Sequence, residues 1–110
     1  IKTMGDGILA TFSGPSRAVE CARELQREAA HLGLSVRAGV HSGECELRDN
    51  DISGIAVNVA ARILDVTPGG ACHVSSTVRD LTTGSGLEFT PAGTHEFKGV
   101  PGTWDLHATV

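Results

Sequence analysis

The sequence predicts an α+β sandwich in which helices pack on an antiparallel-rich sheet. Two stretches with helical apolar spacing, residues 15–32 and 55–66, lie among short apolar runs that Gly and Pro interrupt. Mixed helical and strand patterns in this order are typical of an α+β domain. The chain has 110 residues, 40% of them apolar and 20% charged, which is enough for one hydrophobic core.

The first elements are a hairpin and a long helix. Residues 2–4 and 8–12 are apolar strands on either side of Gly5-Asp6-Gly7, a glycine-rich hairpin tip. Residues 15–32 form an amphipathic helix, which Gly33 ends. Its predicted buried stripe consists of Val19, Ala22, Leu25, Ala29 and Leu32.

The middle of the chain predicts a second hairpin. Residues 35–41 read as a strand, and residues 44–47 read as its partner, joined through Ser42-Gly43. A polar loop, Arg48-Asp-Asn-Asp51, follows.

The second half begins with a helix over residues 55–66, ended by Pro68-Gly-Gly70. Residues 71–74 predict a short strand, and residues 76–81 a short helix capped by Ser75 or Ser76. Three late strands, punctuated by Gly and Pro, are expected at residues 87–92, 95–98 and 103–107.

The segment from Asp51 to Leu64 is the strongest functional signal. Asn58 and Arg62 are four residues apart, so they share one helical face. Asp51 accepts hydrogen bonds, Asn58 offers a donor and an acceptor, and Arg62 is a cationic fork that suits phosphate. Taken singly, such residues are usually a helix cap and solvated surface. Together they predict a nucleotide site, with the base at one end and the phosphates at the other.

Asp6 at the first hairpin tip is a candidate ligand for Mg²⁺, which proteins hold through one or two carboxylates plus substrate phosphates. Gly-Asp-Gly is also ordinary turn chemistry, so this assignment depends on the rest of the site.

Composition and charge exclude several classes of function. The net charge of −4 argues against a nucleic-acid partner, and no apolar run is long enough for a membrane contact by a spanning helix. Three cysteines without CxxC spacing suit free thiols in a reducing, cytoplasmic compartment. The five histidines lack zinc-site spacing.

Four blocks in order resemble the catalytic domain of class III nucleotide cyclases, in a bacterial form of the actinobacterial type. The blocks are Lys2-Thr-Met-Gly-Asp6, then Val36-Arg-Ala-Gly-Val-His-Ser-Gly-Glu44, then Asp51-Ile-Ser-Gly54 with Val57-Asn-Val-Ala-Ala-Arg62, and finally Phe97-Lys-Gly99. The resemblance covers residues 2–99 and implies a ferredoxin-like α/β sandwich. It also implies an adenylate cyclase that converts ATP to 3′,5′-cyclic AMP and pyrophosphate in intracellular signal transduction.

The resemblance implies a role for each site residue. Lys2 and Asp51 would read the adenine edge, and Asn58 would orient the ribose. Arg62 would act on the phosphates in the transition state, and Lys98 would approach the terminal phosphates.

The family also implies metal ions and a second subunit. Asp6 would be the second of two metal-binding aspartates for a pair of Mg²⁺ or Mn²⁺ ions. The active sites would lie at the interface of a homodimer.

The first metal aspartate of the family lies on a strand upstream of the hairpin, and this chain begins inside a strand pattern. We therefore expect residues 1–110 to be a partial domain without the first strand and its helices, inactive alone. Two alternatives stay open: a non-catalytic cyclase-like module for dimerisation or nucleotide binding, and a guanylate cyclase, against which Lys2 and Asp51 argue.

Overall fold

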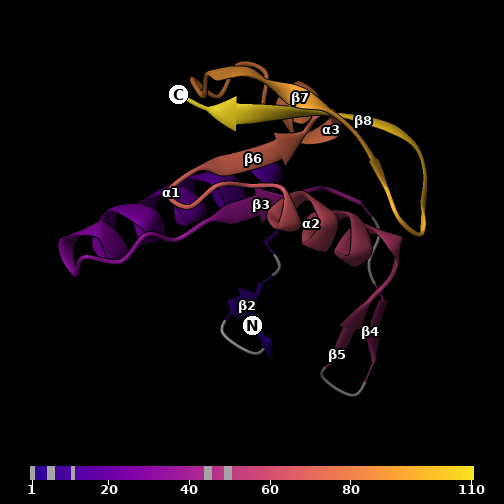
Figure 1. The fold of residues 1–110 in the computed structure, drawn as a ribbon, viewed down its shortest axis with the longest axis horizontal. Helices are drawn as coiled ribbons and strands as arrows, with labels where there is room; N and C mark the ends of the chain where they lie inside the picture. The colour runs from indigo at the N-terminus through magenta and orange to yellow at the C-terminus, as the bar shows by residue number, and fades with distance from the viewer. Residues whose placement is uncertain (1, 5–6, 11, 44–45, 49–50) are drawn as a thin grey trace.

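The computed structural model describes residues 2–4, 7–10, 12–43, 46–48 and 51–110, and for β1, β2, β4 and β5 it describes the backbone alone. The elements follow in the order shown in Figure 1: β1 Lys2–Met4, β2 Gly7–Leu9, α1 Pro15–His31, β3 Ala38–Val40, β4 Glu46–Arg48, β5 Asp51–Ser53, α2 Ile55–Asp65, β6 Cys72–Ser75, α3 Ser76–Leu81, β7 Phe89–Phe97 and β8 Val100–Thr109.

The main sheet has four strands in the order β3-β6-β8-β7. β6 pairs in parallel with β3 and antiparallel with β8, and β7 pairs antiparallel with β8. The predicted α+β class with an antiparallel-rich sheet is therefore confirmed; the sheet is mixed, because β3 and β6 pair in parallel. β1–β2 and β4–β5 form two further antiparallel pairs outside this sheet.

The central strand β6 separates two layers of core. All four of its residues are buried, and successive side chains of a strand point to opposite faces. Cys72 and Val74 pack with Val19 of α1 and Val78 of α3, so these two helices cover one face. His73 and Ser75 consequently lie on the other face.

α2 covers that second face. Val59 and Ile63 of α2 form a cluster with Phe97, Val100 and Leu106 of β7 and β8. Figure 1 shows α2 beside β3, at the end of the molecule that also carries the β4–β5 pair.

Gly39 sets the distance between α2 and the sheet. A Cβ at Gly39 would lie 2.9 Å from the Leu64 amide nitrogen and 3.1 Å from the Ala60 carbonyl oxygen, both backbone atoms of α2. A side chain at this position would therefore push the helix away. The helix rests directly on the backbone of β3.

α1 has the predicted span but a different buried stripe. Val19 and Ala29 are buried, whereas Leu25 is 46% exposed and Leu32 is 77% exposed. Gln26 is buried instead. Its amide nitrogen donates to the carbonyl oxygens of Val36 and Ala71, 2.8 Å away in each case.

The Gln26 amide is fully used. Its oxygen accepts from Nη1 of Arg23 at 2.9 Å, which orients the amide nitrogen toward the two carbonyls. Those carbonyls lie just before β3 and β6, so one side chain ties α1 to the start of two neighbouring strands. A buried polar side chain is stable here because each of its polar atoms has a partner.

Two predictions about the middle of the chain are wrong. Residues 44–47 are not the partner of the strand at 35–41, because β3 pairs with β6 and β4 pairs with β5. Asp51 is not in a loop: it is the first residue of β5 and pairs with Arg48. After β3 the chain passes α2 closely: a Cβ at Gly43 would be 3.0 Å from Cβ of Ala56.

The remaining elements agree with the prediction in kind. The hairpin β1–β2, the helix α2 and the helix α3 are confirmed, and Ser75 caps α3 by accepting from the amide of Val78. The predicted strands at 87–92 and 95–98 are one strand, β7, with a register shift between Pro91 and Thr94. The extra residue explains why the sequence pattern breaks there.

The described part of the chain contains two free cysteines, Cys21 on the surface and Cys72 in the core. Burial raises the pKa of the Cys72 thiol to about 11. Within this part no helix is both long and apolar enough to cross a lipid bilayer.

We predict that Gln26→Met destabilises the fold by about 1–3 kcal/mol, since a side chain of similar length without donors removes two hydrogen bonds and leaves the carbonyls of Val36 and Ala71 with their backbone donors alone. Urea denaturation measures the difference. Glu28→Met is the matched control on the exposed side of α1, and it should change stability by less than about 0.5 kcal/mol. Equal effects of the two substitutions would contradict the structural role of Gln26.

Candidate functional site

Asn58 and Arg62 lie on the solvent side of α2. The buried residues of this helix are Ala56, Val59 and Ile63, and both Asn58 and Arg62 are exposed. One turn apart, they share a stripe with Ile55 and Val66, which are 57% and 39% exposed. The predicted pairing on one face therefore agrees with the structure, and two exposed apolar side chains flank it.

Arg62 is only loosely held by the protein. Its Nη1 lies 3.5 Å from a carboxylate oxygen of Asp65, and the two side chains are 44% and 60% exposed. An exposed ion pair of this kind contributes at most about 1 kcal/mol. The guanidinium can consequently leave Asp65 for a stronger anion such as a phosphate.

Gly54 is the single residue between β5 and α2, the helix that carries Asn58 and Arg62. It joins β5 to α2 with a φ of 123°, a conformation that residues with a side chain rarely adopt. The helix begins without a side-chain cap, and the amides of Val57 and Asn58 both donate to the Gly54 carbonyl. Asp51 on β5 is thus only a few residues from the first turn of α2.

Lys98 occupies the turn between β7 and β8 and is exposed. Phe97 and Val100, on either side of this turn, pair with each other and are buried against Val59 and Ile63. Figure 1 shows the hairpin tip reaching toward the end of α2 that follows β5. The structure therefore brings Lys98 to the neighbourhood of α2, although 36 residues separate it from Arg62 in the sequence.

The other predicted site residues are described only in part. Lys2 lies on β1 and Asp51 on β5, and the positions of their side chains are outside the description. Asp6, the candidate metal ligand, lies outside the described residues altogether. Among the residues that are described, no group of three or more His, Cys, Asp or Glu side chains could hold a metal ion.

His41 forms a link that sequence reasoning missed. Its Nδ1 lies 2.8 Å from Oγ of Ser75, and its ring packs edge-on against Trp104, with ring centroids 5.4 Å apart. The sequence predicts His41 as the last residue of a strand before the Ser42-Gly43 turn, and its partners lie 34 and 63 positions further along the chain. Long-range contacts of this kind leave no local pattern.

Three histidines are held in the neutral state by the fold. Burial lowers the pKa of His41, of His73 and of His107. His95 adds to the effect at His73, whose buried Nδ1 has no hydrogen-bond partner. Arg79 adds to it at His107, against the opposing effect of Asp105.

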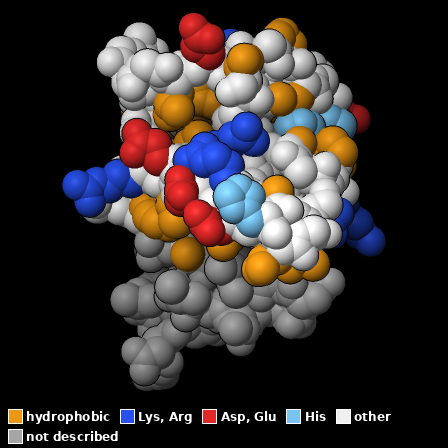
Figure 2. Space-filling model, turned by 90° about the vertical axis from the view of Figure 1, so that its left-hand side faces the viewer, with side chains coloured by type: hydrophobic (Ala, Val, Ile, Leu, Met, Phe, Trp, Pro, Cys, Tyr) orange, Lys and Arg blue, Asp and Glu red, His pale blue; other side chains and the backbone are white. Residues whose placement is uncertain are grey.

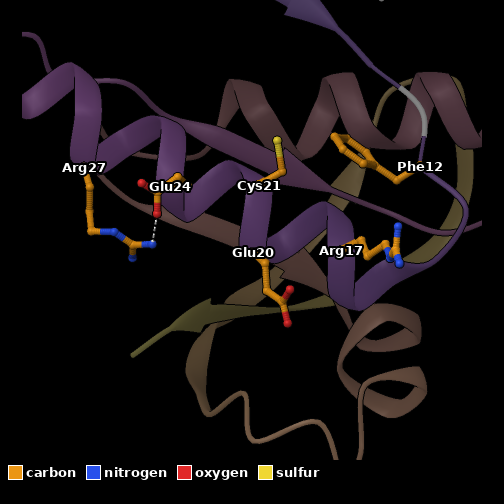
Figure 3. A pocket seen from close by; sticks show the side chains of 6 residues that line it. All are labelled: Phe12, Arg17, Glu20, Cys21, Glu24 and Arg27. Atoms are coloured by element: carbon orange, nitrogen blue, oxygen red, sulfur yellow. Dashed lines mark hydrogen bonds and ion pairs between the residues drawn. The ribbon is translucent and has the colours of Figure 1, made fainter.

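Charges of both signs share the side of the molecule drawn in Figure 2, with apolar side chains between them. The outer face of α1 carries the shallow hollow drawn in Figure 3, lined by Phe12, Arg17, Glu20, Cys21, Glu24 and Arg27. Arg27 is paired there with Glu24. This hollow contains none of the predicted site residues, so the candidate site remains on α2 and the β7–β8 turn.

Comparison with known proteins assigns the family. Residues 1–108 match the family described as adenylate and guanylate cyclase catalytic domain. The pH-sensitive adenylate cyclase of Mycobacterium tuberculosis is 31% identical over 108 residues, which cover 93% of this chain and 27% of that protein. The chain belongs to the family of adenylate and guanylate cyclase catalytic domains.

Solved structures share the fold. An adenylate/guanylate cyclase/hydrolase from Silicibacter pomeroyi has a TM-score of 0.84 at 33% identity, over 99% of this chain and 70% of that one. The catalytic core of a rhodopsin-guanylyl cyclase in complex with ATPαS has a TM-score of 0.72 at 20% identity, over 86% of this chain and 56% of that one. The chain spans only 18% to 35% of the length of curated relatives that it matches.

We predict that the fold loses stability as the pH falls below about 6.5, the ordinary histidine value. A lowered native pKa means that the unfolded state binds more protons in this range, so acid favours unfolding by up to ~1.4 kcal/mol per pH unit for each such proton. Urea midpoints measured across this range should show the slope.

His73→Leu should reduce that slope, because it removes a buried imidazole whose protonation in the folded state lowers the stability of the fold. His31→Leu, at the exposed end of α1, is the control and should leave the slope as in the wild type. A His73→Leu slope equal to that of the wild type would show that this residue does not drive the acid sensitivity.

Proposed function

We propose that this chain is the catalytic domain of an adenylate cyclase. The observation that carries the proposal is the exposed stripe of α2, on which Asn58 and the loosely paired Arg62 lie one turn apart, together with the anchoring of the Lys98 turn to the same helix. A hydrogen-bonding amide and a cation on one helix, with a second cation on a turn anchored to that helix, suit a ribose and its phosphates. Family membership and the adenylate cyclase name of the mycobacterial relative support this assignment.

The proposed reaction is an intramolecular displacement in ATP. The ribose 3′-oxygen forms a bond to the α-phosphorus, the bond to the bridging oxygen breaks, and pyrophosphate leaves while the hydroxyl proton is released. Asn58 orients the ribose, and Arg62 meets the charge that develops on the α-phosphate. Lys98 binds the terminal phosphates. The protein contributes mainly placement and positive charge.

Adenine recognition is assigned to Lys2 and Asp51. Lys2 offers donors only and an ionised Asp51 offers acceptors only. The adenine edge presents a ring nitrogen that accepts and an amino group that donates, so the pair is complementary to it. Guanine presents a carbonyl acceptor and a ring N–H in these places, which the same pair serves less well.

Two divalent ions, Mg²⁺ or Mn²⁺, are the proposed cofactors, with Asp6 as one carboxylate ligand. Such ions would neutralise the phosphates and activate the attacking oxygen. The described residues provide no cluster that fits a metal. The roles of Asn58, Arg62 and Lys98 are therefore those of the side chains themselves.

A second copy of the chain is the proposed partner. Ile55 and Val66 expose apolar surface on either side of Asn58 and Arg62, and exposed apolar surface of this kind favours burial in an interface. A symmetric homodimer would bury the stripe and create two equivalent sites.

We predict that Arg62→Ala, in an active protein that contains this chain, lowers kcat by on the order of 10²–10³ and changes KM much less, because its contact with phosphate strengthens in the transition state. Cyclic AMP formation from ATP is the measurement. Arg79→Ala is the matched control: Arg79 is equally exposed and also paired with an aspartate, but lies on α3. If kcat falls no more in Arg62→Ala than in Arg79→Ala, the assignment of Arg62 is refuted. If the wild-type protein binds ATP but does not turn it over, the non-catalytic module is favoured.

We predict that Lys2→Glu combined with Asp51→Cys depresses ATP use by about 1–3 kcal/mol in transition-state binding, since mismatched polar groups then face the adenine edge. Competition between ATP and GTP in the same protein measures the change. If the double variant keeps the wild-type preference for ATP, these two residues do not read the base.

A further inference from the structure

His41 is in contact with three parts of the fold at once. It follows β3 directly, its Nδ1 lies 2.8 Å from Oγ of Ser75, and its ring packs on Trp104 at an interplanar angle of 85°. Ser75 is completely buried and ends β6, and its Oγ also accepts from the amide of Val78 at 3.3 Å. The imidazole is thus fixed on one side by a hydrogen bond and on the other by an aromatic ring.

Residues 41–43 connect the fixed imidazole of His41 to α2. A Cβ at Gly43 would lie 3.0 Å from Cβ of Ala56 and 3.6 Å from Nε2 of His41. The segment therefore fills the space between the imidazole and the first turn of α2. Asn58 lies two residues beyond Ala56, and its amide helps to close that same turn by donating to Gly54.

Trp104 supports the imidazole of His41 through the ring contact, in addition to the hydrogen bond with Ser75. It packs against the cluster that contains Val59 and Ile63 of α2, and its Nε1 donates to the Pro101 carbonyl at 3.2 Å. The ring that His41 contacts is consequently fixed to the inner face of the helix whose outer face carries Asn58 and Arg62.

We propose that His41 is a positioning residue for the nucleotide site: through its bond to Ser75 it holds residues 41–43 against the first turn of α2 and so sets the position of Asn58. The inference rests on the proposed function for the role of Asn58, whereas the effect on α2 is a property of the fold alone. His41 does not touch the nucleotide. Its lowered pKa keeps the ring neutral, so one nitrogen remains available as an acceptor for the Ser75 hydroxyl.

Two substitutions separate the two contacts of His41. In His41→Asn the amide oxygen Oδ1 is bonded to Cγ, as Nδ1 is in histidine, so it can accept from the Ser75 hydroxyl while the ring is lost. In His41→Phe the ring is kept against Trp104, but the Ser75 hydroxyl loses the nitrogen to which it donates. His31→Phe, at the exposed end of α1, is the matched control.

The first measurement is amide hydrogen exchange of the 110-residue chain. Exchange at Val57 and Asn58, the amides that donate to Gly54, should speed up by on the order of tenfold in His41→Phe. It should stay near the wild-type rate in His41→Asn and in His31→Phe. Exchange in β7 and β8 should change much less than exchange at these two amides.

The second measurement is kinetic, in an active protein that contains this chain. His41→Phe should lower kcat by on the order of 10- to 100-fold, the usual cost of a misplaced group at a reacting centre, with a smaller change in KM for ATP. His41→Asn should restore most of the loss.

Unchanged exchange at Val57 and Asn58 in His41→Phe would overturn the inference. So would an equal acceleration in all elements, because that would show a general loss of stability rather than a local displacement. If the wild-type protein neither binds nor turns over ATP, the proposed function fails, and the exchange measurement still decides whether His41 positions α2.

Discussion

The direct contact between α2 and the backbone of β3 at Gly39 is the constraint on which the rest of the site depends. No side chain separates the two elements there, since a Cβ would come within 2.9 Å of a helix backbone atom. With the helix at this distance, its inner residues reach β7 and β8, and its outer residues form the exposed stripe. The Lys98 turn and the segment after β3 then both have fixed places against the helix.

At other points buried polar side chains fix the positions of helices and strands, as the close contact at Gly39 fixes the position of α2. Gln26 joins α1 to the starts of β3 and β6, and Ser75 joins the end of β6 to α3 and to His41. Because the inner strand β6 has only four residues, such bonds add to the orientation that strand pairing gives. Each has its polar atoms satisfied, which makes burial tolerable in a small core.

Local patterns in the sequence predict much of this fold and a part of the site. The helices α1 and α2 follow from their apolar spacing, and the shared face of Asn58 and Arg62 follows from helical geometry alone. The sequence could not show that β4 pairs with β5, because Asp51-Ile-Ser53 contains a single apolar residue and carries no strand pattern. It could not show the burial of Gln26 in place of Leu25 either, because the partners of the amide lie 10 and 45 residues away. The proximity of Lys98 to α2 depends on the packing of Phe97, which no local pattern contains.

The two described cysteines differ in a way that makes one of them a sensor of opening. Cys21 is exposed on α1, whereas Cys72 is buried in the central strand with a pKa raised to about 11. Cysteine reacts with alkylating reagents as the nucleophilic thiolate, so Cys72 stays protected as long as β6 is covered. Its rate of modification, measured against that of Cys21, therefore reports how often α1 and α3 move off the sheet. The reactivity of a single native thiol is thus a measure of how often the core opens.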